Sequence, residues 1–266
     1  MGEPGSYPGS VTTYLVVAAH PDDPDFGVAG TAARLAREGH AVHYLLLTSG
    51  DAGSDDPGIP REELIRVREA EQEAAGRVLH LTSVQFLRYP DGELEPTLEV
   101  RKDIVRVMRR IRADVVICQD PRALVDDDNT YVNHPDHRAA GQAALDAAFP
   151  AAGNPSAFRD LLEQGLDAHK VKEVWLYFTA SHNVNHWVDI SDTIEQKIAA
   201  LAAHTSQIGE WASSGGLRQE MLKWAEETAG RHNLGFKYAE GFQRIVLVGE
   251  QERPTEAAAL EAQSEE

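Results

Sequence analysis

Apolar runs and longer amphipathic stretches alternate along this chain. Short apolar runs, rich in β-branched residues, predict strands at 11–19, 41–47, 83–87, 114–118, 173–178 and 241–248. The stretches between them predict helices at 26–38, 61–79, 97–111, 135–148 and 192–204, although the pattern is looser after Pro150. This alternation predicts a Rossmann-like, three-layer α/β/α fold with a mostly parallel sheet. In such folds the active site lies at the carboxyl ends of the strands.

The length and composition are those of one globular domain with short extensions. The chain has 266 residues, of which 42% are hydrophobic and 26% are charged. We expect one domain over residues 11–249, a disordered start over 1–10 that is rich in Gly, Pro and Ser, and an acidic, disordered tail over 250–266. The single cysteine, Cys118, cannot form an intrachain disulfide, which fits a cytoplasmic protein.

The charge of the chain argues against two classes of partner. Its formal net charge of -18 is opposite to the basic surface that nucleic acids and anionic membranes require. No apolar run approaches the ~18 residues that would indicate a membrane span. We therefore expect a small-molecule partner, with no nucleic acid and no membrane.

The first segment that suggests chemistry follows the apolar run at 11–19. It places His20, Asp22 and Asp23 directly after a buried strand. Zinc binds imidazole nitrogen and carboxylate oxygen, and a catalytic zinc keeps one position open for water. His20 and Asp23 can therefore supply two ligands, which leaves Asp22 free near the metal. The ordinary alternative is that Asp22 or Asp23 only caps the helix that follows.

A second segment of the same kind is Asn133-His134-Pro135-Asp136-His137, which also follows a predicted strand and opens a helix. The two histidines are three residues apart, so they lie near one face of the first helical turn. His137 can be a third ligand, with His134 at the edge of the metal site. The alternative is an exposed polar turn in which Pro135 starts the helix.

The two segments are more informative together than apart. Each contains His-Pro-Asp, each follows an apolar strand, and both should open at the same edge of the sheet. Coincidence is the weaker explanation for such a pair. We therefore predict one zinc ion (Zn2+) per chain, held by His20, Asp23 and His137.

These motifs identify a resemblance to the LmbE-like (PIG-L) family of zinc-dependent N-deacetylases. The signatures Ala-His-Pro-Asp-Asp and His-Pro-Asp-His of that family match residues 19–23 and 134–137. The segments 48–51, 89–94 and 197–207 and the helix around Arg68 are also similar. Pro24 stands where the signature usually has Glu. Val132 stands where some members acting on mycothiol precursors have a tyrosine, which leaves open whether the neighbouring Tyr131 contributes to catalysis.

The resemblance implies a role for each residue of the site. His20, Asp23 and His137 would bind zinc, and Asp22 would be the general base. His134 would stabilise the oxyanion, as a cation, or act as general acid. Asp136 would orient His134. Substrate binding would involve Asp51, Arg68 and Asp91, although an exposed ion pair for Arg68 and a turn position for Asp91 are ordinary alternatives.

The reaction implied is hydrolysis of the amide of an N-acetylglucosamine-type conjugate by zinc-activated water. Its substrate would be a small amino-sugar conjugate with a polar or thiol-bearing aglycone, and the resemblance also implies a homo-oligomer. Specificity should come from the loops 49–60, 120–133 and 150–170. The aspartates of these loops predict an acidic rim around the site that disfavours phosphorylated substrates. The alternative is that these aspartates only cap helices or stay solvated. The alternatives are a deacylase of thiol conjugates or antibiotics, a metal phosphoesterase, and a catalytically silent sugar-binding protein.

Overall fold

The computed structural model describes residues 11–127 and 129–247 of the chain. The predicted disordered segments at 1–10 and 250–266 lie outside the described residues, as does the last residue of the strand predicted at 241–248. Within the described part of the chain, no helix combines the length and the hydropathy that a membrane span requires.

One sheet organises the described residues, with the strand order β3-β2-β1-β4-β5-β7-β6. Neighbouring strands from β3 to β5 are parallel, whereas β7 is antiparallel to both β5 and β6. The strands are β1 (Thr13–Ala18), β2 (Ala41–Thr48), β3 (Ser83–Tyr89), β4 (Val115–Gln119), β5 (Glu173–Tyr177), β6 (His186–Asp189) and β7 (Ala239–Val246). The prediction of a mostly parallel sheet is confirmed.

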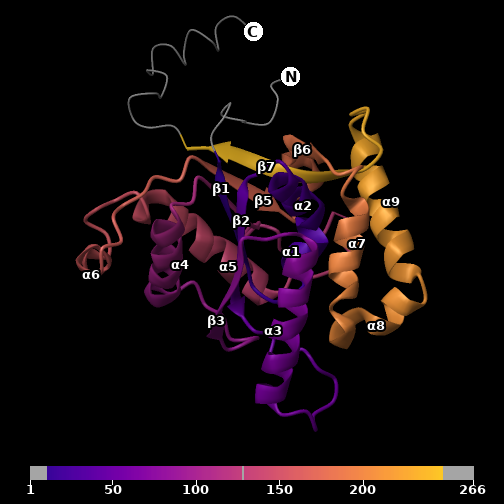
Figure 1. Cartoon of the computed structure of the whole chain (residues 1–266), viewed down its shortest axis with the longest axis horizontal. Helices are drawn as coiled ribbons and strands as arrows, with labels where there is room; N and C mark the ends of the chain where they lie inside the picture. The colour runs from indigo at the N-terminus through magenta and orange to yellow at the C-terminus, as the bar shows by residue number, and fades with distance from the viewer. Residues whose placement is uncertain (1–10, 128, 248–266) are drawn as a thin grey trace, which may run out of the picture.

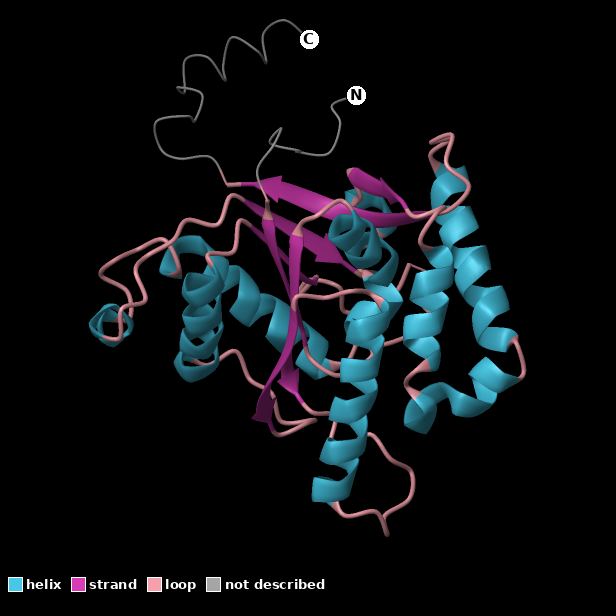
Figure 2. Ribbon diagram, viewed as in Figure 1, coloured by secondary structure: helices cyan, strands magenta, loops and turns pink. Residues whose placement is uncertain are grey.

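Helices cover both faces of this sheet, with α4 and α5 on one side and α2, α3 and α7 on the other (Figures 1 and 2). The helices are α1 (Asp23–Gly27), α2 (Ala29–Arg37), α3 (Arg61–Val78), α4 (Leu98–Ile111), α5 (Pro135–Asp146), α6 (Arg159–Glu163), α7 (Ile194–Ala202), α8 (Thr205–Ser213) and α9 (Gly216–Arg231), with a π-helical turn (Ala147–Ala151) and a 3-10 turn (Ser181–Asn183). The result is the predicted three-layer α/β/α architecture.

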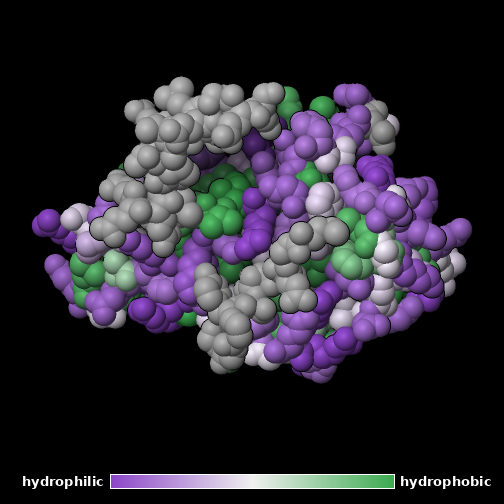
Figure 3. All heavy atoms as spheres, turned by 90° about the horizontal axis from the view of Figure 1, so that it is seen from above, coloured by the Kyte–Doolittle hydropathy of each residue, from purple (hydrophilic) through white to green (hydrophobic). Residues whose placement is uncertain are grey.

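The core lies on both sides of the central strand β1. Leu15 and Val17 pack into the cluster under α4 and α5, and Val16 and Ala18 pack into the cluster under α2 and α7. A strand buried on both faces needs apolar residues at successive positions, which explains the continuous apolar run in the sequence. On the outside, the face shown in Figure 3 is mostly hydrophilic, with smaller hydrophobic areas between the polar side chains.

Two parts of the fold differ from the prediction. The helix expected at 26–38 begins earlier, at Asp23, and is divided into α1 and α2 at Val28, whose φ of -134° is not helical. Pro24 fits the first turn of α1 because proline needs no hydrogen-bonded N–H there. The elements α6, β6, α8 and α9 were not predicted, because α6 and β6 are short and half of the residues that α9 buries are alanines.

The strand order places the two polar motifs together. The chain passes from β1 to β2 and β3 on one side, and then returns to place β4 on the other side of β1. The carboxyl ends of β1 and β4 therefore flank a topological switch point, where parallel sheets open a crevice. His20 follows β1, and the segment that contains His134 and His137 follows β4.

Candidate active site

The turn after β1 presents two carboxylates. Asp22 occupies the N-cap position of α1, but its side chain makes no capping hydrogen bond, and its backbone has φ 82° and ψ -34°. Asp23 lies in the first turn of α1, where its Oδ2 accepts a hydrogen bond from the backbone N–H of His20 at 2.8 Å. Helix capping therefore does not explain the side chain of Asp22.

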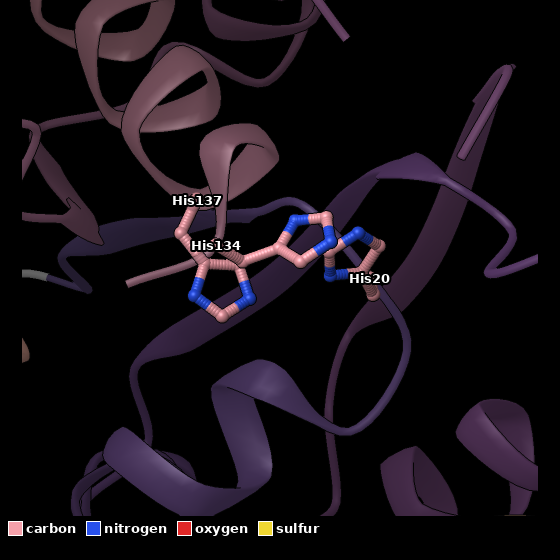
Figure 4. A group of neighbouring side chains, drawn as sticks. All are labelled: His20, His134 and His137. Atoms are coloured by element: carbon pink, nitrogen blue, oxygen red, sulfur yellow. The ribbon is translucent and has the colours of Figure 1, made fainter. Parts of the chain in front are cut away.

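Asp23 stands between two histidines from different motifs. Its Oδ2 is 3.2 Å from Nδ1 of His20, and its Oδ1 is 3.1 Å from Nε2 of His137. The ring of His134 lies beside both, with centroids 4.8 Å from His20 and 5.4 Å from His137 (Figure 4). The structure thus brings together the residues that the sequence predicted as a group.

In both His20 and His137, the ring nitrogen that faces away from Asp23 has a partner of its own. Nδ1 of His137 is 2.9 Å from Oδ1 of Asn133. Nε2 of His20 is 3.0 Å from Oδ1 of Asp91 and 3.3 Å from Oδ2 of Asp136. Metal-binding histidines are commonly oriented in this way, by a carboxylate or amide oxygen on the second ring nitrogen.

The donor set fits a divalent metal ion. Two overlapping groups among the described residues offer ligand atoms that all lie within 4.8 Å of one another: His20, His134 and His137, and His20, Asp91 and Asp136. Imidazole nitrogen and carboxylate oxygen are ligands that zinc accepts. The residues therefore form a possible His/Asp metal site at this edge of the sheet. Neither group includes Asp23, so the ligand set His20, Asp23 and His137 stays a prediction.

The two adjacent aspartates titrate in opposite directions. Burial raises the pKa of Asp22 to about 6, against the opposing pull of the Arg68 guanidinium. Burial acts in the same sense on Asp23, but the facing His137 and His20 rings hold the pKa of Asp23 well below its usual range. Asp23 is therefore a stable carboxylate, whereas Asp22 can exchange a proton near neutral pH.

Arg68 and Gln72, both from α3, hold the segment around Asp22. The NH2 group of Arg68 donates to the carbonyl of Pro21 at 2.9 Å and lies 3.5 Å from Oδ2 of Asp22, and its NH1 group donates to the carbonyl of Gly50. Oε1 of Gln72 accepts from the backbone N–H of Asp22 at 3.0 Å. Arg68 is buried, so it does not form the exposed ion pair that was the alternative explanation.

His134 and Asp136 interact mainly through the backbone. The N–H of Asp136 donates to Nδ1 of His134 at 3.2 Å, while the carboxylate of Asp136 is 4.0 Å from that atom and accepts from the N–H of Gly92 at 2.8 Å. Burial, with a contribution from the nearby His20, lowers the pKa of His134. Both observations favour a neutral ring with its proton on Nε2, rather than the cation expected from the sequence.

Asp51 and Asp91 form a second layer around His20. Asp91 lies at a turn, as the alternative explanation proposed, yet its Oδ1 contacts His20 and its Oδ2 accepts from the N–H of Ala52 at 3.0 Å. Oδ1 of Asp51 accepts from the N–H of Asp91 at 3.0 Å, and its Oδ2 is 3.1 Å from Arg61. Direct contacts of Asp51, Asp91 and Arg68 with a substrate stay predictions.

Sequence reasoning did not assign roles to three amides that support the site. Asn133 holds His137, Gln72 holds the peptide of Asp22, and Nε2 of Gln119 donates to Asp23 at 3.2 Å. Asn133 precedes His134 in the second motif, so its position was a usable signal. Gln72 is one of many polar residues of α3, and Gln119 is the last residue of an apolar strand, so only the packing shows which way they point.

Two cavities lie outside this cluster. One, of about 570 Å³, lies between the loop after β2 and the start of α8 and includes Asp55, Asp56 and Gln207. The other, of about 240 Å³, lies beside α9 and includes Phe178, Trp187 and Trp224. The first has the acidic character predicted for the loop 49–60.

The fold and the site together are a mostly parallel α/β sheet with a possible His/Asp metal site at its switch point. The chain belongs to the PIG-L (LmbE-like) family, because the family model described as GlcNAc-PI de-N-acetylase matches residues 15–148. This confirms the resemblance that the two His-Pro-Asp motifs indicated.

Several relatives of the chain are deacetylases. The chain is 37% identical to a diacetylchitobiose deacetylase from Thermococcus kodakarensis, over 88% of this chain and 84% of that protein. It is 30% identical to a 1D-myo-inositol 2-acetamido-2-deoxy-alpha-D-glucopyranoside deacetylase from Rhodococcus erythropolis, over 90% and 98% of the two chains. The structure of N,N'-diacetylchitobiose deacetylase from Pyrococcus horikoshii superposes with a TM-score of 0.78 at 30% identity, covering 89% of this chain and 85% of that one.

Proposed function

We propose that this chain is a zinc-dependent deacetylase of small N-acetylated amino sugars, with His20, Asp23 and His137 as the metal ligands. The observation that carries the proposal is the difference between Asp22 and Asp23. Asp23 is held between two histidines, whereas Asp22 stands beside them with a pKa of about 6 and, among the described residues, forms its ion pair with Arg68 and none with a histidine. A site with fixed ligands and one free carboxylate is suited to hydrolysis by general-base catalysis.

The protein residues and the metal would divide the chemistry between them. Bound zinc would polarise the amide carbonyl and lower the pKa of water at the site. Asp22 accepts the proton of the water that attacks the carbonyl carbon. Arg68, 3.5 Å from Oδ2 of Asp22, favours the ionised carboxylate that this step requires.

His134 is placed to serve the carbonyl oxygen and the leaving amine. Because its Nδ1 accepts from the N–H of Asp136, the proton of the neutral ring is on Nε2, which can donate to the developing oxyanion. The proton that Asp22 received then passes to the amine, either directly or through His134. A neutral His134 can therefore still stabilise the oxyanion or act as general acid.

Diacetylchitobiose is the substrate best supported for a first test. The deacetylase from Thermococcus kodakarensis is 37% identical to this chain. Asp55 and Asp56 line the cavity between the loop after β2 and the start of α8, and their charge disfavours phosphorylated sugars there. The inositol glucosaminide named for the Rhodococcus relative is the next substrate to compare. A glucosaminide whose aglycone carries a thiol stays an alternative substrate for an enzyme of this fold.

A panel assay of amine and acetate release tests the proposal. The zinc-loaded protein is incubated with N,N'-diacetylchitobiose, free N-acetylglucosamine, its inositol and malate glucosaminides, a thiol conjugate, an acylated glycopeptide antibiotic and N-acetylglucosamine 6-phosphate. We expect release of acetate and amine in equal amounts, fastest from a neutral glucosaminide. Release of phosphate with two metal ions per chain would support a phosphoesterase instead, and binding without turnover would support a silent sugar-binding protein.

A further inference from the structure

A chain of buried polar side chains leads from the backbone of Asp22 to His204. The N–H of Asp22 donates to Oε1 of Gln72 at 3.0 Å, and Nε2 of Gln72 donates to Oδ2 of Asp25 at 2.8 Å. The same oxygen of Asp25 is 2.8 Å from Nε2 of His204. Gln72, Asp25 and His204 are all fully buried, and they come from α3, α1 and the residue before α8.

This arrangement determines which way the amide of Gln72 faces. A carboxylate only accepts hydrogen bonds, so Asp25 must face the NH2 group of Gln72, and this turns the amide oxygen toward Asp22. His204 in turn holds the carboxylate of Asp25. Without His204, the carboxylate would have a single side-chain donor among the described contacts and would be free to rotate.

The peptide group of Asp22, where this series of hydrogen bonds ends, needs such support. Asp22 has a φ of 82°, a backbone conformation that residues with a side chain rarely adopt. The peptide group before Asp22 is held at both its polar atoms, since Gln72 accepts from the N–H of Asp22 and Arg68 donates to the carbonyl of Pro21. The carbonyl of Asp22, on the other side of the residue, accepts from the first turn of α1. Because the φ angle sets the direction of the Cα–Cβ bond, its relaxation would move the carboxylate of Asp22 away from the metal ligands.

We propose that His204 is a positioning residue, which acts through Asp25 and Gln72 to hold Asp22 in this conformation. The proposal rests on the assignment of Asp22 as the general base. A buried imidazole–carboxylate pair contributes little net stability compared with apolar side chains of similar volume. The role of the pair is therefore to fix a geometry, and the geometry at its end is that of the base.

Neighbouring residues provide a matched structural control. Glu71, next to Gln72 on α3, accepts from the hydroxyl of Thr205 at 2.9 Å and from the backbone and hydroxyl of Ser206, both at 2.7 Å. These bonds fasten the start of α8 to α3 beside His204, but they do not lead to Asp22. Ser206→Ala therefore weakens the contact between α3 and the start of α8 but leaves Gln72, Asp25 and His204 in place.

The test compares His204→Leu with His204→Gln, which restores an N–H donor. We expect His204→Leu to lower kcat roughly 10–100-fold, as removal of outer supporting groups does at metal sites, with KM and zinc content unchanged. His204→Gln should recover most of the loss, and Ser206→Ala should lower Tm but keep kcat. Full kcat in His204→Leu, or loss of its zinc, would overturn the proposal.

A second comparison separates positioning from general destabilisation. In an Asp22→Asn background, His204→Leu should cause no further loss of the residual turnover, because the group it positions is gone. An equal fold-loss in both backgrounds would show that His204 acts elsewhere. If Asp22→Asn alone is fully active, the assignment of Asp22 as the base fails. A crystal structure of His204→Leu then tests separately whether His204 holds the backbone of residue 22. A changed φ at residue 22 supports that role, and an unchanged φ refutes it.

Discussion

Asp22 and Asp23 are adjacent in the chain, yet their carboxylates lie in opposite electrostatic environments. Asp23 faces His20 at 3.2 Å and His137 at 3.1 Å, and its pKa is held well below the usual range. Asp22 is mostly buried, its ion-pair partner Arg68 is 3.5 Å away, and its pKa is raised to about 6. Pairs of carboxyl groups separated in this way commonly divide ligand and acid–base roles, and the predictions below test that division.

Asp22→Asn should retain zinc and lower kcat roughly 10²–10⁴-fold, the usual contribution of a general base. The amide has nearly the shape of the carboxylate but cannot accept the proton. Acetate release from diacetylchitobiose and metal analysis of the same sample measure the two effects. Turnover near that of the unmodified protein would mean that another group is the base.

His137→Ala should sharply lower zinc occupancy, because it removes a proposed ligand. Asn133→Ala should weaken zinc binding by a smaller factor, roughly 10–100-fold, because Asn133 only orients His137 through the 2.9 Å contact to Nδ1. Competition with a chelator of known affinity gives both values. Unchanged occupancy in His137→Ala would refute the ligand assignment.

The pH dependence of kcat/KM should show an acid limb set by Asp22. Only the ionised carboxylate accepts a proton, so activity falls as the pH falls through its pKa and levels off above it. The limb should lie at or below pH 6, because burial raises the pKa to about 6 and a bound cation would pull it down. Zinc content must be followed at each pH. A profile that is flat to pH 4 with zinc retained would contradict this prediction.

The protein should form a homo-oligomer in solution, an expectation that rests on the family resemblance alone. Light scattering over a range of concentrations measures the mass directly, and a chain mass of 29.2 kDa gives the reference. The prediction would be abandoned if the mass stayed at this value at every concentration used in the activity assays.

Local pattern was enough to predict the sheet and to place the proposed ligands at one edge of it. The strand β1 is buried on both faces from Tyr14 to Ala18, so its residues there are hydrophobic at successive positions and easily recognised. His20, Asp23 and His137 follow strands that the α/β alternation makes parallel, and parallel strands bring their carboxyl ends to one edge. Two motifs more than a hundred residues apart could thus be assigned to one site before any coordinates were known.

The supporting contacts depended on packing between distant elements. Gln72 lies among charged residues of α3, and His204 precedes three polar residues, so neither periodicity nor spacing distinguishes them from solvated side chains. Only the approach of α3 and the start of α8 to the turn after β1 buries them and turns them toward Asp25. Likewise, the sequence placed Asp136 beside His134, but the fold directs its carboxylate to His20 and Gly92. A side chain's partner is decided by which elements converge on it, and that convergence belongs to the tertiary structure.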